Sequence, residues 1–369
     1  MVVWAILGFV IIVLALQDAF ESIILPGSVK RRFKLISIFY FFSWSMVKPF
    51  ILAVRNRARR QWILAAYPPV TVIALIAMWA TLILVGFAMI QFGLQIPFNH
   101  TQEPRFIDTL YFSGVTLFTL GYGDMIPATD LGRGLAVIEA ASGFGFLALV
   151  ISYIPVLYGA FSRREHQIVL LDTKAGSDPT AFEMLRRYAA AGVLPDLTDL
   201  LRDWERFSAE LLESYLSYPV LAYYRSQHEH QSWLRSLTAI LDVCAFIEAS
   251  VVADEPWSRS LRFQARNTFA MARHVLVDLA YILDKAPIDG PCRLGSVPYA
   301  EIHDNLRNLG VPLRETIVCD LRLQALMQMY EPFARSLATE IIVQLPDWVP
   351  PEGMVDNWQT SAWEGVRHF

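Results

Sequence analysis

The sequence predicts an all-α membrane protein in two parts, an apolar N-terminal half and a helical C-terminal half. Of the 369 residues, 54% are hydrophobic and only 18% are charged, whereas a soluble globular protein carries about 25% charged residues. Residues 1–165 hold 13 lysines and arginines against 8 acidic residues, and residues 166–369 hold 18 against 27. This composition argues against a disordered chain and a wholly soluble enzyme, and the acidic second half argues against nucleic acid as a partner.

Residues 1–28 predict an N-terminal transmembrane helix. Residues 2–16 are apolar without a charge, and only Met1 precedes them, so the basic segment of a signal peptide is missing. Asp18 and Glu21 follow at a spacing that places them on one face of the helix. We expect both carboxylates to lie near the lipid headgroups and to meet basic side chains there.

Residues 29–67 contain a second apolar stretch, 35–54, with basic clusters on both sides. A membrane span would place one of these clusters outside, against the positive-inside rule. The polar residues also form one narrow helical stripe, which suits a helix lying on the membrane surface. We therefore favour an interfacial helix, which puts the N-terminus of the chain outside, and a second span stays open as the alternative. The stripe consists of Lys34, Ser37, Ser45, Lys48 and Arg55.

Residues 68–164 contain two further apolar runs that predict membrane-spanning helices. Pro68 and Pro69 precede the first run, 70–90, and the second run covers 135–161. Each run is long enough to cross about 30 Å of hydrocarbon. The chain therefore crosses the membrane twice in this part, with a connecting segment between the two crossings.

The connecting segment contains a short helical pattern and a glycine-rich motif. The helix should begin near residue 107, with Asp108 as its expected N-cap. Glycine adopts positive φ without a steric penalty, so glycines at alternate positions let successive carbonyl groups point to one axis. The motif reads Thr119-Leu120-Gly121-Tyr122-Gly123-Asp124.

Over residues 69–165 this order of helix, short helix, glycine-rich turn and helix resembles the pore domain of potassium channels, in the form of the small bacterial two-helix channels. The resemblance implies a two-helix plus pore-loop channel domain, to which the preceding residues add an N-terminal helix and an interfacial helix. It implies that backbone carbonyls replace the water around a K+ ion, and that four copies form the pore as a homotetramer. The implied K+ ligands are the carbonyl oxygens of Thr119, Leu120, Gly121 and Tyr122, and Gly123 and Asp124 complete the selectivity filter. Leu120 departs from the usual valine, a tolerated change because its carbonyl is the ligand.

Three residues of the second apolar run are candidate gating positions. Gly143 lies where the related channels carry a hinge glycine, and Gly145 follows it. These glycines either let the helix bend or allow close helix packing, and the sequence leaves both readings open. Pro155 removes a backbone hydrogen bond and should kink the same helix.

Glu139 is an ionisable residue inside the same run. Several channels of the family carry a glutamate behind the filter, at the position that Val115 occupies here. An ionisable side chain at membrane depth is a functional candidate by default. Glu139 therefore either tunes the filter or the cavity field, or is a neutral, hydrogen-bonded side chain behind the pore helix.

Residues 165–369 predict an all-α cytoplasmic domain that regulates or assembles the channel, and they resemble no family that we recognise. Three cysteines without a CxxC pair fit a reducing compartment. His228 and His230 diverge on a helix, which argues against a shared metal. A tail with Trp348, Trp358 and Trp363 should dock on the bundle or on a neighbouring subunit. After an extended piece at 167–171 we expect helices at 179–191, 196–217, 231–253, 258–284, 299–309 and 313–344.

The sequence thus predicts a potassium-selective channel of the cell membrane that conducts passively, is not an enzyme and needs no cofactor. Its partners should be other copies of the chain, the bilayer, and an unidentified cytoplasmic ligand or protein. A regular series of basic residues typical of a voltage sensor is absent. The alternatives are a weakly selective cation channel and a membrane-anchored signalling protein with a vestigial pore. A transporter with four pore loops is disfavoured, since the chain has one such motif.

Overall fold

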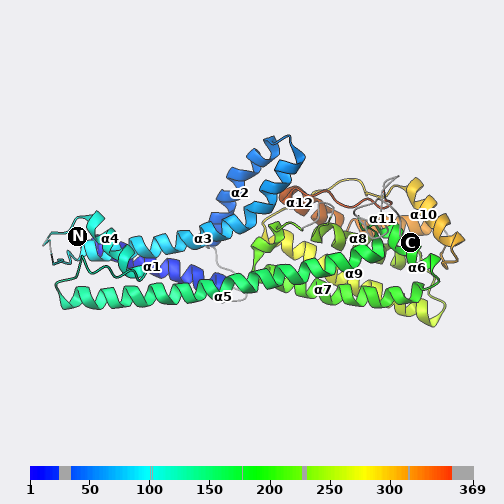
Figure 1. Cartoon of the computed structure of the whole chain (residues 1–369). Coiled ribbons are helices and arrows are strands. Elements are labelled where there is room, and N and C mark those ends of the chain that lie inside the picture. Colours follow the sequence, from blue (N-terminus) through cyan, green and yellow to red (C-terminus); the bar gives the residue numbers. More distant parts are fainter. Residues whose placement is uncertain are drawn as a thin grey trace, which may run out of the picture. The chain divides into compact units, whose positions relative to one another are not determined.

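The computed structural model describes residues 1–24, 35–99, 101, 103–176, 178–226, 231–314 and 316–350 (Figure 1). Every regular element in this part of the chain is a helix, so the predicted all-α class is confirmed. The chain divides into two compact units, Met1–Gly159 and Ala160–Phe369, hereafter unit 1 and unit 2. The basic cluster at 30–34, the His228 and His230 pair, and Trp358 and Trp363 lie outside the described residues.

Three of the described helices are long and apolar enough to cross a membrane. They are α1 (Val2–Ile23), α3 (Arg57–Gly93) and α5 (Asp130–Ala175), of which α5 begins in unit 1 and ends in unit 2. The shorter helix α4 (Phe106–Leu117) lies between α3 and α5 in the chain. These four helices share one apolar core in unit 1, formed by Ile12, Ala15, Ile83, Phe87, Ile90, Leu117, Leu135 and Phe146.

The N-terminal helix α1 packs antiparallel against α3, backbone to backbone (Figure 1). A Cβ atom added to Gly8 would lie 2.4 Å from the carbonyl oxygen of Gly86, and one added to Gly93 would lie 2.5 Å from the amide nitrogen of Ala5. Small residues allow this kind of approach between helices in membranes. The α1 helix is therefore an integral part of unit 1.

Asp18 of α1 bonds to a tryptophan of α3, and the basic cluster nearest to it in sequence, 30–34, lies outside the described residues. Its side chain is 8% exposed, and it accepts a hydrogen bond of 2.9 Å from the indole Nε1 of Trp79 on α3. A buried polar atom needs such a partner, and the fully buried Trp79 supplies a donor that sequence spacing alone does not indicate.

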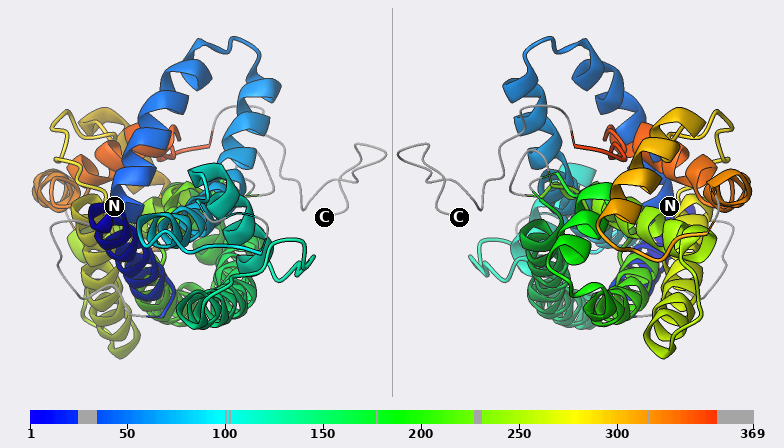
Figure 2. Two further views of the ribbon diagram at one scale, coloured as in Figure 1. Left: turned by 90° about the vertical axis from the view of Figure 1, so that its left-hand side faces the viewer. Right: turned by 90° about the vertical axis from the view of Figure 1, so that its right-hand side faces the viewer.

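The segment 35–67 forms a helical hairpin with a turn at residues 54–56 (Figure 2). Its first arm is α2 (Leu35–Ala53), and its second arm is the first part of α3. The side chain of Asn56 caps α3 by accepting a hydrogen bond from the Arg59 amide, 3.0 Å. The arms meet through Ser43 Oγ and Tyr67 Oη, 3.0 Å apart.

The boundary expected at residue 68 lies inside α3, because the helix starts at Arg57 and continues through Pro68 and Pro69. Thr71 Oγ1 donates a hydrogen bond of 2.8 Å to the Pro68 carbonyl. The two prolines remove the amide donors that would bond the Leu64 and Ala65 carbonyls one turn earlier, and membrane helices tolerate such prolines. Whether α2 lies on the membrane or spans it stays a prediction.

The α5 helix continues to Ala175, so the extended piece expected at 167–171 was wrong. Ile168, Leu171 and Ala175 are each fully buried and recur at helical spacing. The apolar run is short enough to resemble a strand locally, and packing within unit 2 selects the helix.

Unit 2 is built around α8 (Trp233–Ser250), in which every residue except Arg235 is buried. The predicted helix at 313–344 is two helices, α11 (Thr316–Met327) and α12 (Glu331–Ile341), because Pro332 sits in the first turn of a new helix. All three cysteines are free. The other elements are α6 (Ala181–Ala190), η1 (Leu194–Asp196), α7 (Leu197–Ser217), η2 (Pro219–Tyr223), α9 (Pro256–Ile282) and α10 (Ser296–Asn308).

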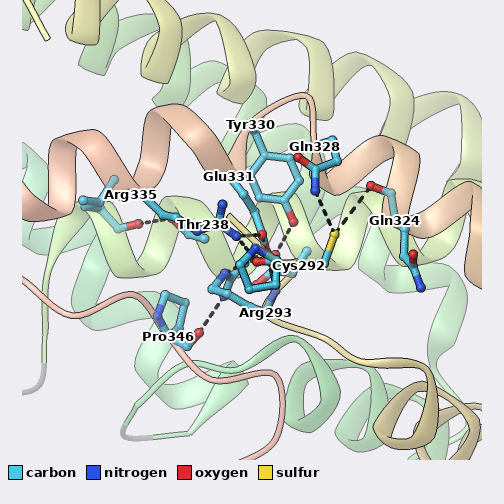
Figure 3. Close-up of polar contacts among 12 residues, drawn as sticks. Thr238, Cys292, Arg293, Gln324, Gln328, Tyr330, Glu331, Arg335 and Pro346 are labelled. Atoms are coloured by element: carbon cyan, nitrogen blue, oxygen red, sulfur yellow. Dashed lines mark hydrogen bonds and ion pairs between the residues drawn. The ribbon is translucent and has the colours of Figure 1, made fainter. Parts of the chain in front are cut away.

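A buried ionic cluster ties α8 to α12 through the loop after α9 (Figure 3). Arg293 of this loop contacts Asp242 of α8 at 2.5 Å and Glu331 of α12 at 2.9 Å. Arg335 contacts the same Glu331 at 2.6 Å, and the Tyr330 hydroxyl donates to Asp242. Two carboxylates thus face two guanidinium groups, and the cluster is balanced in charge, as a buried set of ions requires.

Candidate functional site

The short helix α4 begins with a reciprocal pair of capping contacts. Arg105 is the N-cap residue, and its amide donates to Asp108 Oδ2 at 3.0 Å. Asp108 therefore occupies the third helical position, and our assignment of Asp108 as the N-cap was wrong by three residues. The pattern is that of a capping box, in which the third residue reaches back to the N-cap amide. The buried side of α4 packs against α3.

Residues 119–123 alternate in backbone handedness. Positive φ values occur at Thr119 (57°), Gly121 (63°) and Gly123 (76°), and Leu120 and Tyr122 between them do not have positive φ. Alternation of this kind turns successive carbonyl groups toward the same side of the chain. Positive φ is expected at glycine but not at threonine, so the Thr119 conformation is a feature that the residue types did not predict.

The α4 helix supports the motif from behind. The amide of Leu120 donates to the Val115 carbonyl at 2.9 Å, and the amide of Gly121 donates to the same oxygen at 3.4 Å. Val115 thus supports the loop through its backbone carbonyl, and its side chain carries no ionisable group.

Asp124 is held at the end of the motif by two residues that the sequence did not single out. The Tyr111 hydroxyl of α4 donates to Asp124 Oδ2 at 2.7 Å, and the Asn99 side-chain amide donates to the Asp124 carbonyl at 3.2 Å. The loop is therefore fixed at both ends. Tyr111 and Asn99 lie 13 and 25 residues before Asp124, spacings that form no recognisable motif. These two contacts therefore become visible only in the folded chain.

The motif is open on one side within a single chain. Leu120 is 54% exposed and Tyr122 is 67% exposed. A Cβ atom added to Gly121 or Gly123 would meet no atom within 4 Å. Residues 119–123 are therefore all exposed in the single chain and leave room for a neighbouring molecule beside them.

Glu139 of α5 is fully buried between α3, α4 and α5. Its Oε2 accepts a hydrogen bond of 2.8 Å from the Gln91 side chain, whose Nε2 also lies 3.4 Å from Ser113 Oγ of α4. Glu139 is thus a hydrogen-bonded side chain behind α4, and both of our readings of its role stay predictions.

Gly143 and Gly145 of α5 differ in their surroundings. A Cβ atom added to Gly143 would lie 2.1 Å from the carbonyl oxygen of Leu117, whereas one added to Gly145 would meet nothing within 4 Å. Gly143 therefore permits the close approach of α5 to the end of α4. The α5 helix also continues through Pro155, and hinge motion at these positions stays a prediction.

Residues 72–158 match a family model described as Ion channel. This match confirms the resemblance of residues 69–165 to the pore domains of potassium channels, a family of channels rather than of enzymes. No solved structure matches the chain, and no group of acidic, histidine and cysteine side chains in the described residues could hold a metal ion.

Curated relatives share parts of the chain. Protein LctB of Geobacillus stearothermophilus is 35% identical over 85 residues, 20% of this chain and 63% of the relative. The uncharacterized membrane protein YdjJ of Bacillus subtilis is 27% identical over 186 residues, 49% of this chain and 52% of the relative. Potassium channel subfamily K member 16 of Mus musculus is 35% identical over 89 residues, 22% of this chain and 30% of the relative. The chain thus spans less than two thirds of the length of these relatives.

The Gly143→Ala substitution should destabilise unit 1, because the new methyl group would overlap the Leu117 carbonyl. Overpacking of this kind costs about 1–3 kcal/mol. Gly145→Ala is the matched control and should leave stability unchanged, since its site is open. Thermal unfolding of the full-length protein in detergent measures both. Equal melting temperatures for the two variants would contradict the close packing at Gly143.

Proposed function

We propose that this chain is a potassium-selective channel that conducts passively through a homotetrameric pore. The observation that carries the proposal is the alternating backbone of residues 119–123 within the Thr119–Asp124 motif. A dehydrated K+ ion needs closely spaced oxygens in place of its water, and rings of backbone carbonyls supply them. The carbonyls of Thr119, Leu120, Gly121 and Tyr122 would line the path, and no cofactor is needed.

Two features of the single chain support the proposed tetramer, namely the incomplete ring of carbonyls and the exposed apolar surface of α5. One copy supplies one strand of carbonyls, and a closed ring around an ion needs four. Large apolar side chains of α5 are exposed as well, including Val137 and Phe144 at 70% each and Ile151 at 64%. Neighbouring copies and lipid would cover these side chains, because exposed apolar surface of this extent marks an interface.

The short helix α4 and Asp124 would both attract cations to the pore. The C-terminus of α4 leads into Thr119, so the negative end of its dipole would face the cavity behind the filter. Asp124 would sit at the outer mouth and attract cations. Unit 2 would then lie in the cytoplasm, consistent with the basic residues that flank α2 and follow the membrane part of α5.

A weakly selective channel is the second candidate, and a signalling protein with a vestigial pore is the third. Both would tolerate a disturbed filter. The ordered alternation at residues 119–123 and its support from Val115 and Tyr111 favour the selective channel over both.

The reversal potential of the purified protein in a bilayer tests the proposal, with K+ on one side and Na+ on the other. It should lie near the K+ equilibrium potential. Gly121→Ala should abolish that selectivity or the current, because alanine resists a φ of 63°. Gly134→Ala serves as the control, because a Cβ atom added there would meet nothing within 4 Å. A current that does not distinguish the two ions would favour the weakly selective channel, and silence of folded tetramers would favour the signalling protein.

Glu139→Gln tests whether the buried carboxyl tunes conduction. The substitution keeps the shape of the side chain and removes its ability to ionise, so it should change the unitary K+ conductance and flatten its dependence on pH. Ser142→Ala, a half-buried position whose hydroxyl bonds to the Ile138 carbonyl within α5, is the control. Identical conductance and pH profiles for Glu139→Gln and the wild type would show that Glu139 is only structural.

We further propose that unit 2 gates the pore through the end of α5. Arg164 lies in the part of α5 that belongs to unit 2, is 2% exposed, and contacts both α7 and η2. Its Nη1 donates to the Tyr215 hydroxyl at 3.1 Å and to the Leu221 carbonyl at 2.8 Å, and its Nη2 donates to the Tyr224 carbonyl at 2.9 Å. This contact would carry a movement of α7 and η2 into α5, which continues into the pore.

Arg164→Met should alter the open probability without moving the reversal potential, because it breaks the contacts of α5 with α7 and η2 within unit 2 and leaves the filter intact. Tyr215→Phe should produce a smaller change of the same kind. Arg163→Met is the matched control, since that neighbour is exposed. Single-channel recording measures both quantities. An unchanged open probability in Arg164→Met would contradict coupling through this residue.

A further inference from the structure

A second cluster of arginines in unit 2 is unbalanced in charge, unlike the cluster around Arg293. Three guanidinium groups converge on Glu248, which lies near the end of α8. The Nη2 atoms of Arg262 and Arg266 on α9 lie 3.3 and 2.8 Å from Glu248 Oε1, and that of Arg322 on α11 lies 2.6 Å from it. All three contacts share one oxygen atom.

This convergence is electrostatically costly. Because each nitrogen contacts the same oxygen, the three lie within about 6 Å of one another, where like charges repel. Arg314 adds a further positive charge, with its amide bonded to the Ser250 carbonyl at 2.9 Å. The pKa of Arg262 is lowered, first by burial and then by the charges of Arg314 and Arg322, although Glu248 opposes the change.

The cluster around Arg293 in Figure 3 contains a second carboxylate, whereas the described cluster around Glu248 contains one. There, Asp242 and Glu331 offset Arg293 and Arg335, and both carboxylates are fully buried. Around Glu248 the described residues supply one carboxylate for three guanidinium groups. Among the described groups that contact Glu248 directly, two positive charges are therefore left over, in a unit that is acidic as a whole.

The surplus charge is open to solvent. The side chain of Arg266 is 66% exposed and that of Arg322 is 43% exposed, whereas Glu248 is 9% exposed. The carboxylate thus lies at the base of the cluster and the arginines form its rim. A ligand can reach the guanidinium groups from outside without moving α8.

We propose that Arg262, Arg266 and Arg322 form a binding site for a phosphate-bearing anion, with Glu248 holding the three side chains together. The planar guanidinium fork matches phosphate oxygens. A phosphate group carries up to two negative charges at neutral pH, which offsets the surplus, whereas a single carboxylate offsets only half of it. The phosphate belongs to either a soluble anion or a lipid headgroup.

Calorimetric titration of the full-length protein with sodium pyrophosphate tests the site at constant ionic strength, in phosphatidylcholine nanodiscs. We expect saturable binding, and about tenfold weaker binding in Arg266→Gln and in Arg322→Gln, since each removes a charge-assisted hydrogen bond. Arg266 is exposed enough for its substitution to leave folding intact. Arg202→Gln is the control, because this substitution removes the same positive charge elsewhere in unit 2. Arg202 pairs there with Asp199 at 2.5 Å.

The source of the phosphate is distinguished by repeating the titration in nanodiscs that contain phosphatidic acid. If phosphatidic acid weakens pyrophosphate binding to the wild type but not to Arg322→Gln, the natural ligand is a lipid headgroup. If the pyrophosphate affinity of the wild type is unchanged by this lipid, the natural ligand is a soluble anion. Absence of binding in both arms, or an equal loss of affinity in Arg202→Gln, would overturn the site. Because binding is measured directly, the result does not depend on whether the channel conducts.

Discussion

The alternating backbone of residues 119–123 is the constraint on which unit 1 depends. Three of these five residues adopt positive φ, and one of them is Thr119, for which that conformation costs about 1–3 kcal/mol. Such a conformation persists only where its surroundings fix it. The amides of Leu120 and Gly121 are held by the Val115 carbonyl, and Asp124 is held by Tyr111. Both supports lie on α4, so the position of α4 decides the position of the loop.

The position of α4 is in turn set by the other helices of unit 1. Its last residue, Leu117, belongs to the core that α1, α3 and α5 share. Gly143 lets α5 approach the Leu117 carbonyl, and Gly8 and Gly86 let α1 approach α3. A side chain at any of these glycines would separate two backbones, and the displacement would reach α4. The N-terminal helix therefore contributes to the geometry of the loop, although it lies outside the segment that matches the ion-channel family.

The features predictable from the sequence were those encoded by local residue types. Glycines at alternate positions indicated the loop conformation, and long apolar runs indicated α1, α3 and α5. The features that it missed depend on contacts between distant residues. The α3 helix continues through Pro68 and Pro69, and residues 167–171 are helical with Ile168 and Leu171 buried in unit 2. Asp18 and Trp79 are 61 residues apart, and nothing in the spacing of either links them.

Arg164 illustrates how a buried charge can fix the register of two elements. A guanidinium group has five N–H donors, and burial without partners would cost several kcal/mol. Five hydrogen bonds are present, three to Tyr215, Leu221 and Tyr224 and two to Glu165. Two of the acceptors are backbone carbonyls at and after η2, so the fit depends on where that segment lies along α5. A shift of one turn would leave these carbonyls without a donor and the guanidinium group with only its two bonds to Glu165, and therefore α5 and η2 should move together or not at all.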